Sequence, residues 1–179
     1  MVLDIINSAL PVLTVLGQVI LGLFVLGGII VAVSSSSLSQ RLKDIWDSLI
    51  PYSGYIAFLS AALAMSGSLF YSQIMGYDPC LLCWWQRIFM YPLVLLIPIA
   101  LYFRDKYIVR YIIPMSVIGG GIAIAHYIQQ LTQVAMCGGT TSCAVKYTFH
   151  YGYITIPVMA LTSFALILLF ISNWARDTV

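Results

Sequence analysis

The chain has 179 residues, of which 61% are hydrophobic and only 8% are charged. A soluble domain has about a quarter charged residues, so this composition excludes an ordinary soluble domain and predicts a membrane protein in contact with lipid. The net charge of +2 is too small to suggest a nucleic-acid partner, and no basic cluster interleaves with aromatic residues. None of the six acidic residues lies deep in an apolar run, which argues against an ion pump built on intramembrane carboxylates.

Five long uncharged runs follow one another, and each can hold one membrane-crossing helix of about 20 residues. The predicted helices are residues 8–33, 51–72, 81–103, 110–133 and 153–174. The sequence therefore predicts an all-α polytopic membrane protein.

The first predicted helix is followed by a polar linker that contains Ser34, Ser37 and Gln40. A cleaved signal peptide would begin with a positive region and have a much shorter apolar stretch, so we expect this helix to be retained. We divide the chain into an additional N-terminal transmembrane helix with its linker, residues 1–45, and a four-helix core, residues 46–179. In the first helix of that core, small residues share one face that permits close packing: Ala57, Ala61, Ala64 and Ser68.

Basic residues predict the orientation of the bundle. If the five spans alternate in direction, six of the eight basic residues fall on one side: Arg41, Lys43, Arg104, Lys106, Arg110 and Arg176. The positive-inside rule makes that side cytoplasmic. We therefore expect the N-terminus outside, the C-terminus in the cytoplasm, and two outward-facing loops at residues 73–80 and 134–152.

All four cysteines fall at these outward loops, in two close pairs. Cys80 and Cys83 form a C-x-x-C at the start of the third predicted helix, and Cys137 and Cys143 flank five residues of the other loop. Disulfides persist on the extracytoplasmic side, and two close pairs favour exchange between pairs. A helix N-terminus also lowers the pKa of a thiol, which produces the reactive thiolate.

Other interpretations of the cysteines remain open. Two structural disulfides would staple the loops, and four thiolates would suit a zinc ion. A C-x-x-C can also occur at an interface by chance. We favour redox exchange and expect no metal.

Three polar residues of the predicted helices lie at a common depth beneath the outer surface. Arg87 is about 9 Å below the outer end of its helix, and His126 and Gln130 share one face of the next at a similar depth. They can converge near Cys83, where a quinone headgroup needs hydrogen-bond donors and a proton route. Alternatively, Arg87 extends to the lipid headgroups, and His126 and Gln130 only bond neighbouring helices.

The fourteen residues from Pro79 to Pro92, PCLLCWWQRIFMYP, resemble the signature of the bacterial disulfide bond formation protein B family. The similarity spans about residues 50–175 and is closest to the C-type, BdbC-like members, which have a short second cysteine loop. The spacing of Cys137 and Cys143, and the pair His126 and Gln130, also fit. The first 45 residues depart from the family pattern, so the role of the first helix is open.

This resemblance implies a four-helix bundle in the bacterial cytoplasmic (inner) membrane that carries a bound quinone, ubiquinone or menaquinone. It also implies an extracytoplasmic partner, a thioredoxin-fold (DsbA-like) thiol oxidase. By the resemblance, Cys137 forms the mixed disulfide with this partner, and Cys143 is its pair-mate. Cys80 then exchanges with the second loop. Cys83 lies against the quinone, and Arg87 stabilises the negative charge there.

Two further hypotheses compete with this one. A vitamin K epoxide reductase-like enzyme also couples thiols to quinones, but in that family the quinone-side C-x-x-C follows the shuttle pair along the chain, whereas here it precedes it. A non-enzymatic membrane scaffold with stapled loops would tolerate alanine at Cys83 or Arg87.

Overall fold

The computed structural model describes residues 2–33, 37–133, 137 and 142–177. Within these ranges the chain is helical and contains no strand; an isolated bridge pairs His150 with Ile154. The helices in chain order are α1 (Val2–Val33), α2 (Ser37–Leu69), the π-helix η1 (Phe70–Ile74), α3 (Leu81–Met90), α4 (Leu93–Phe103), the 3₁₀-helix η2 (Lys106–Ile108), α5 (Val109–Thr132) and α6 (Ile156–Asp177).

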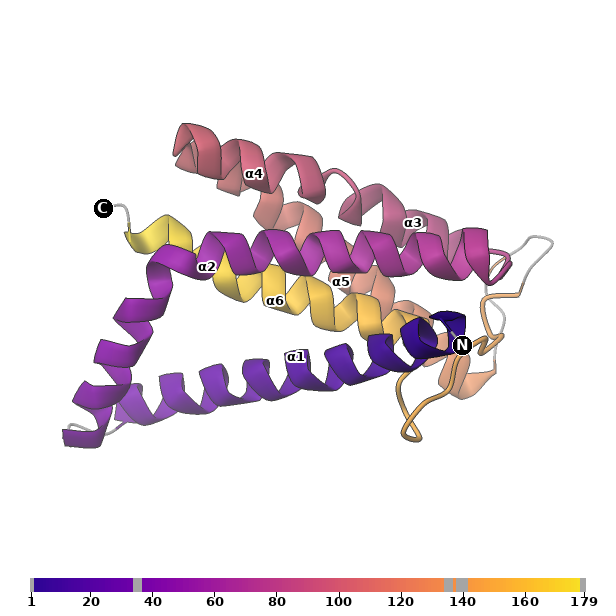
Figure 1. Cartoon of the computed structure of the whole chain (residues 1–179), viewed down its shortest axis with the longest axis horizontal. Helices are drawn as coiled ribbons and strands as arrows, with labels where there is room; N and C mark the ends of the chain where they lie inside the picture. Colours follow the sequence, from indigo (N-terminus) through magenta and orange to yellow (C-terminus); the bar gives the residue numbers. More distant parts are fainter. Residues whose placement is uncertain (1, 34–36, 134–136, 138–141, 178–179) are drawn as a thin grey trace.

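Five segments of the described chain are long and apolar enough to cross a membrane: Ile6–Val33, Gln40–Ile74, Leu81–Phe103, Lys106–Thr132 and Ile156–Arg176. The predicted all-α polytopic architecture is therefore confirmed. Figure 1 shows α2, α6 and α5 running side by side, with α3 and α4 end to end along them and α1 lying outside this group.

The core lies between α2, α4, α5 and α6, where Leu93, Ile97, Ile112, Phe164 and Ile167 have no exposed surface. Helices α5 and α6 approach each other closely, because a Cβ atom at Gly119 would overlap the ring of Phe164. The face of small residues predicted on α2 packs into this core, since Ala57 and Ala61 are fully buried.

Prolines shape two of the predicted spans. Pro51 lies inside α2, which bends along its length in Figure 1. The span predicted over residues 81–103 is confirmed as a membrane-crossing segment, but it consists of two helices, because α3 ends at Met90 and α4 begins at Leu93. Pro92 has no N–H to bond the carbonyl of Ile88, so the chain forms a turn between the two helices.

The helix predicted from residue 51 begins earlier, at Ser37, so Gln40 lies in α2 instead of a linker. Ser34, in the predicted linker, lies outside the described residues. The proposed division between residues 45 and 46 falls inside α2 and stays a prediction.

The two ends of the bundle differ in chemistry (Figure 1). One end carries the cysteines. The helix ends that meet there are the start of α1, the end of α2, the start of α3, the end of α5 and the start of α6. The six basic residues noted above flank or occupy helix ends at the opposite end of the bundle. This segregation agrees with the predicted orientation, although which end faces the cytoplasm stays a prediction.

Candidate redox site

The C-x-x-C motif occupies the first turn of α3. Cys80 is the N-cap residue with an extended backbone, and its carbonyl accepts the first helical hydrogen bond from the N–H of Trp84 at 3.1 Å. The helix brings Cys83 back to the same side, so that the two Sγ atoms lie 3.2 Å apart. Both residues are free thiols; Cys80 is buried and Cys83 is partly exposed.

The surroundings of Cys80 stabilise its thiolate. The hydrogen bond from the Cys83 thiol is the largest cause that lowers the pKa of Cys80, to about 4, against the opposing effect of burial. His126 on α5 lowers this pKa further, with its Nε2 at 3.7 Å from Cys80 Sγ. Cys80 is therefore a thiolate at neutral pH, the form that attacks disulfides and leaves them most readily.

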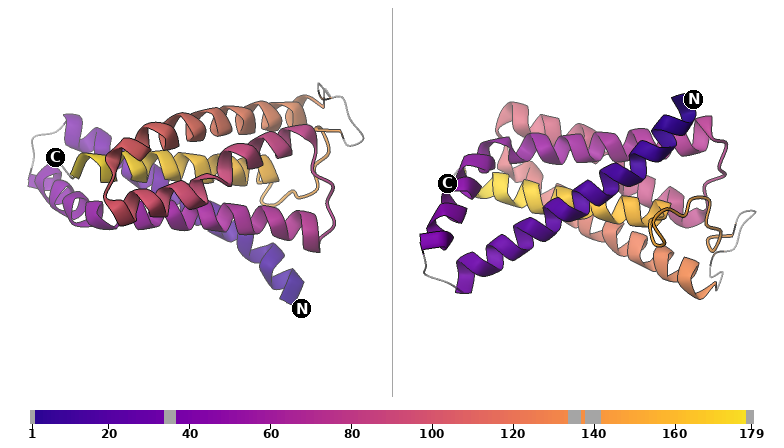
Figure 2. Two further views of the ribbon diagram at one scale, coloured as in Figure 1. Left: turned by 90° about the horizontal axis from the view of Figure 1, so that it is seen from above. Right: turned by 60° about the horizontal axis from the view of Figure 1, so that its bottom comes forward.

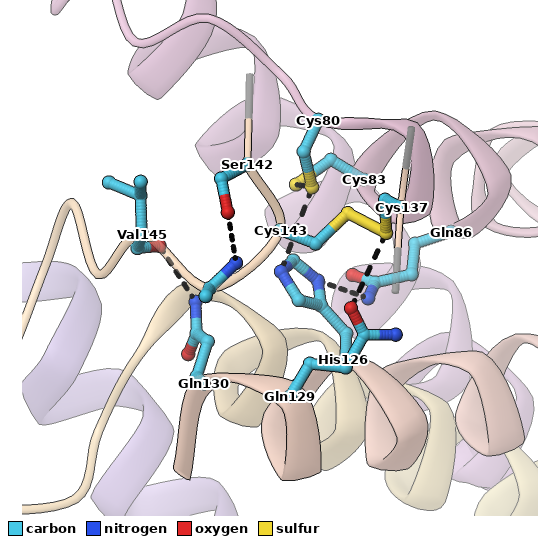
Figure 3. The surroundings of a disulfide bond; sticks show 11 residues. Cys80, Cys83, Gln86, His126, Gln129, Gln130, Cys137, Ser142, Cys143 and Val145 are labelled. Carbon is cyan, nitrogen blue, oxygen red and sulfur yellow. Dashed lines mark hydrogen bonds between the residues drawn. A yellow bond between two sulfur atoms is a disulfide. The ribbon is translucent and has the colours of Figure 1, made fainter. Parts of the chain in front are cut away.

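Gln86 holds His126 in the tautomer that this contact requires. Its Nε2 lies 3.1 Å from His126 Nδ1, and both side chains are buried. An amide nitrogen only donates, so Nδ1 accepts and the ring hydrogen is on Nε2, which points to Cys80 Sγ (Figure 3). The sequence analysis missed Gln86; the signal was an uncharged polar residue inside an apolar helix, one turn after Cys83.

The second cysteine pair is a disulfide between Cys137 and Cys143, with a Cα–Cα distance of 6.0 Å. Cys143 is only 1% exposed, whereas Cys137 is partly exposed. Gln129 Oε1 on α5 lies 3.4 Å from Cys137 Sγ, where it can accept a hydrogen from this thiol once the disulfide is reduced. Figure 3 shows the disulfide beside the C-x-x-C, with His126 beneath both.

Gln130 fastens the second loop to α5. Its Nε2 donates a hydrogen bond to the carbonyl of Val145 at 3.1 Å. Ser142 and Val145, which flank Cys143 in this loop, line a small cavity together with Cys80 and His126. The sequence places this loop far from the C-x-x-C, and the fold brings the two pairs together.

A larger cavity of about 160 Å³ lies on the other side of Cys83. Its lining is mostly apolar, and Cys83, Gln86 and Arg87 mark its polar end. Arg87 is fixed there, because its Nε donates to Ser68 Oγ at 2.9 Å and its Nη2 to the Ser68 carbonyl at 3.1 Å. Ser68 thus does more than the close packing expected of it: it orients the cation.

Aromatic side chains lie where the two cavities meet. Tyr147 lines both of them and stacks on Tyr77 at 4.9 Å between ring centroids. Burial raises the pKa of the Tyr147 phenol, with smaller contributions from Asp78, Cys80 and Cys83.

The three predicted polar residues do not converge on one pocket. Arg87 lines the large cavity, whereas His126 and Gln130 line the small one, and Cys83 borders both. Successive positions on a helix point about 100° apart, so Gln86 turns toward α5 while Arg87 turns toward α2.

Cys80, Cys83 and His126 have side-chain atoms within 4.8 Å of one another, close enough to share a metal ion. The four-thiolate zinc site considered above requires Cys137 and Cys143 as thiolates, and these two are joined in a disulfide.

Comparison with known proteins identifies a family for most of the chain. The family described as disulfide bond formation protein DsbB matches residues 53–173. Disulfide bond formation protein C of Bacillus subtilis is 42% identical over 120 residues, which cover 65% of this chain and 87% of that protein. A probable disulfide formation protein of Coxiella burnetii is 37% identical over 131 residues, 68% of this chain and 89% of that protein. No solved structure matches.

Proposed function

Because the chain belongs to the disulfide bond formation protein DsbB family, a family of membrane oxidoreductases that form disulfides, we propose that it is a thiol:quinone oxidoreductase. It reoxidises a thioredoxin-fold (DsbA-like) partner and thereby supports disulfide formation outside the cytoplasm. One observation supports the proposal most directly. The Cys137–Cys143 disulfide lies beside the reduced Cys80/Cys83 pair, in which Cys80 is a thiolate, and Cys83 borders an apolar cavity.

In the first step the partner transfers its electron pair to the second loop. A partner thiolate attacks Cys137 Sγ, breaks the Cys137–Cys143 bond and releases Cys143 as a thiolate. The other partner thiol then attacks the mixed disulfide, which frees Cys137 and leaves the partner oxidised. The greater exposure of Cys137 supports it as the sulfur attacked, since Cys143 is only 1% exposed.

In the second step the reduced loop pair transfers the electrons to an oxidised Cys80–Cys83 pair. A loop thiolate attacks Cys80 and releases Cys83 next to Arg87. The other loop thiol then resolves the mixed disulfide and releases Cys80. A thiol of low pKa leaves fastest, so the low pKa of Cys80 of about 4 favours this direction. The cycle re-forms the Cys137–Cys143 disulfide and leaves a Cys80/Cys83 dithiol.

The large cavity suits a quinone, either ubiquinone or menaquinone. Its walls are apolar, and its polar end carries the Cys83 sulfur and the Arg87 guanidinium, which can donate to a carbonyl oxygen. A bound quinone would supply a two-electron, two-proton acceptor that returns Cys80 and Cys83 to a disulfide. Arg87 favours negative charge at Cys83, while His126 and Gln130 act on the other side, at Cys80 and the loop.

The proposed location is the bacterial cytoplasmic (inner) membrane, with the N-terminus and both cysteine pairs outside and the C-terminus in the cytoplasm. The six basic residues at the end opposite the cysteines support this orientation.

Trapping the mixed disulfide tests the assigned order. A reduced thioredoxin-fold dithiol protein with its second cysteine replaced by alanine is mixed with the full chain. We expect a covalent complex with the wild type, because the remaining partner thiolate attacks the Cys137–Cys143 disulfide, bonds to Cys137 and releases Cys143 as a free thiol. Non-reducing gels and peptide mass spectrometry identify the bond. Bonds from the partner to Cys143 that are as abundant as bonds to Cys137 in the wild-type complex would contradict the order.

A further inference from the structure

Helix α1 contributes to the large cavity although it lies outside the region that matches the family, residues 53–173. Leu10, Leu13 and Thr14 form part of the cavity wall, opposite residues of α2 and α6. Among the residues of α1 whose burial is described, only three are buried. Its described buried positions, Pro11, Thr14 and Gly17, fall at the level of the cavity.

Specific contacts hold α1 at this position. Gly67 on α2 makes room for Leu10, because a Cβ atom at Gly67 would lie 3.2 Å from Leu10 Cδ2. Gly17 lies equally close to Thr162 on α6. Gln18 accepts a hydrogen bond from the Tyr153 hydroxyl at 2.6 Å and donates one to Thr162 Oγ1 at 3.3 Å. Figure 2 shows the resulting path of α1, oblique across the bundle, with its N-terminus near the cysteine end.

The cavity has one polar end and leads away from it along apolar side chains. Cys83 and Arg87 mark the polar end, while Leu63 and Leu13 line the cavity yet are 41% and 44% exposed. These two residues therefore lie at a mouth that opens toward the surrounding lipid. A headgroup at Cys83 would extend its isoprenoid tail toward this mouth, because the tail of a membrane quinone is far larger than about 160 Å³.

We propose that α1 forms one wall of the channel for the isoprenoid tail of the quinone, and that Leu10 and Leu13 determine how well a tailed quinone binds. This inference rests on the proposed quinone reaction. The added helix would leave the sulfur chemistry unchanged and increase apolar contact with the tail, which favours binding in proportion to the area covered.

The test compares one headgroup with and without a tail. The full chain in detergent receives a reduced thioredoxin-fold dithiol protein and a benzoquinone that carries either no tail or a long isoprenoid tail. Leu13→Trp narrows the mouth, and Leu16→Trp is the matched control, since Leu16 lies on the same helix, is 53% exposed and does not line the cavity. For Leu13→Trp we expect KM for the tailed quinone to rise about tenfold, equivalent to about 1.4 kcal/mol. KM for the tailless quinone should rise far less than KM for the tailed quinone, because a headgroup at Cys83 does not extend to the mouth.

Leu10→Ala and Leu13→Ala provide a second pair of variants that removes contact without adding bulk. They should lower the amount of tailed quinone that copurifies with the chain, a measurement independent of turnover. Equal effects on tailed and tailless quinones, or a lipid acyl chain copurifying in place of the quinone, would overturn the tail channel alone. No thiol-dependent reduction of either quinone by the wild type would instead overturn the proposed function.

Discussion

Cys80 shows how residues from two helices lower the pKa of one thiol. Cys83, in the same turn of α3, hydrogen-bonds its thiolate, and His126 reaches it from α5. Gln86 acts indirectly, because it fixes which ring nitrogen of His126 carries the hydrogen. The four cysteines, Arg87, His126 and Gln130 could be named from the sequence. The links through Gln86 and Ser68 could not, since they depend on which face of α3 meets which neighbour.

The pH dependence of alkylation tests this arrangement. In a Cys137→Ala/Cys143→Ala background, the rate of alkylation of Cys80, followed by peptide mass spectrometry, should stay constant as pH falls from 8 to about 5. It should decline only near pH 4, because the lowered pKa keeps the thiolate until then. Gln86→Leu should move this midpoint upward, since Nε2 of His126 is no longer held as a donor. Gln129→Leu is the control, because Gln129 contacts the sulfur of Cys137, which this background lacks. An unchanged midpoint in Gln86→Leu would refute the role of Gln86.

At the scale of the helices, charge and hydropathy predicted five spans, and the described chain contains them. The interruption between α3 and α4 was missed, although Pro92 is visible in the sequence. Hydropathy averaged over a segment does not reveal the one backbone hydrogen bond that Pro92 cannot donate. A proline alone is also a weak signal, because proline is tolerated inside α1, α2, α4 and α5. The pairing of helices was also beyond the sequence, because it depends on close approaches such as Gly119 on Phe164.

Two neighbouring glycines of α5 provide a matched test of this packing. Gly119→Ala should lower the free energy of unfolding in detergent by about 1–3 kcal/mol, because its Cβ would overlap the buried ring of Phe164. Gly121→Ala should be neutral or stabilising, since no heavy atom lies within 4 Å of the added Cβ and alanine favours a helix. Equal stabilities for the two variants would mean that α5 and α6 do not meet at Gly119.

Over the whole molecule, the redox groups and the basic residues lie at opposite ends of the bundle. The cysteine pairs and the polar end of the large cavity lie at one end, and the six basic residues lie at the other. The resemblance to the disulfide bond formation family, carried by residues 79–92, is confirmed by the match over residues 53–173. Helix α1 precedes that match, so the family pattern predicted neither its path nor its contribution to the cavity wall.

The most direct measurement of the central claim follows quinone absorbance. Purified full chain in detergent is mixed with a soluble quinone analogue and an excess of a reduced thioredoxin-fold dithiol protein, and wild type is compared with Cys83→Ala. We predict steady loss of quinone that requires both the dithiol protein and Cys83, with one quinone reduced for each partner disulfide formed. Quinone loss at an equal rate in Cys83→Ala, or none in wild type with all four cysteines locked in disulfides, would contradict the relay and favour a stapled scaffold.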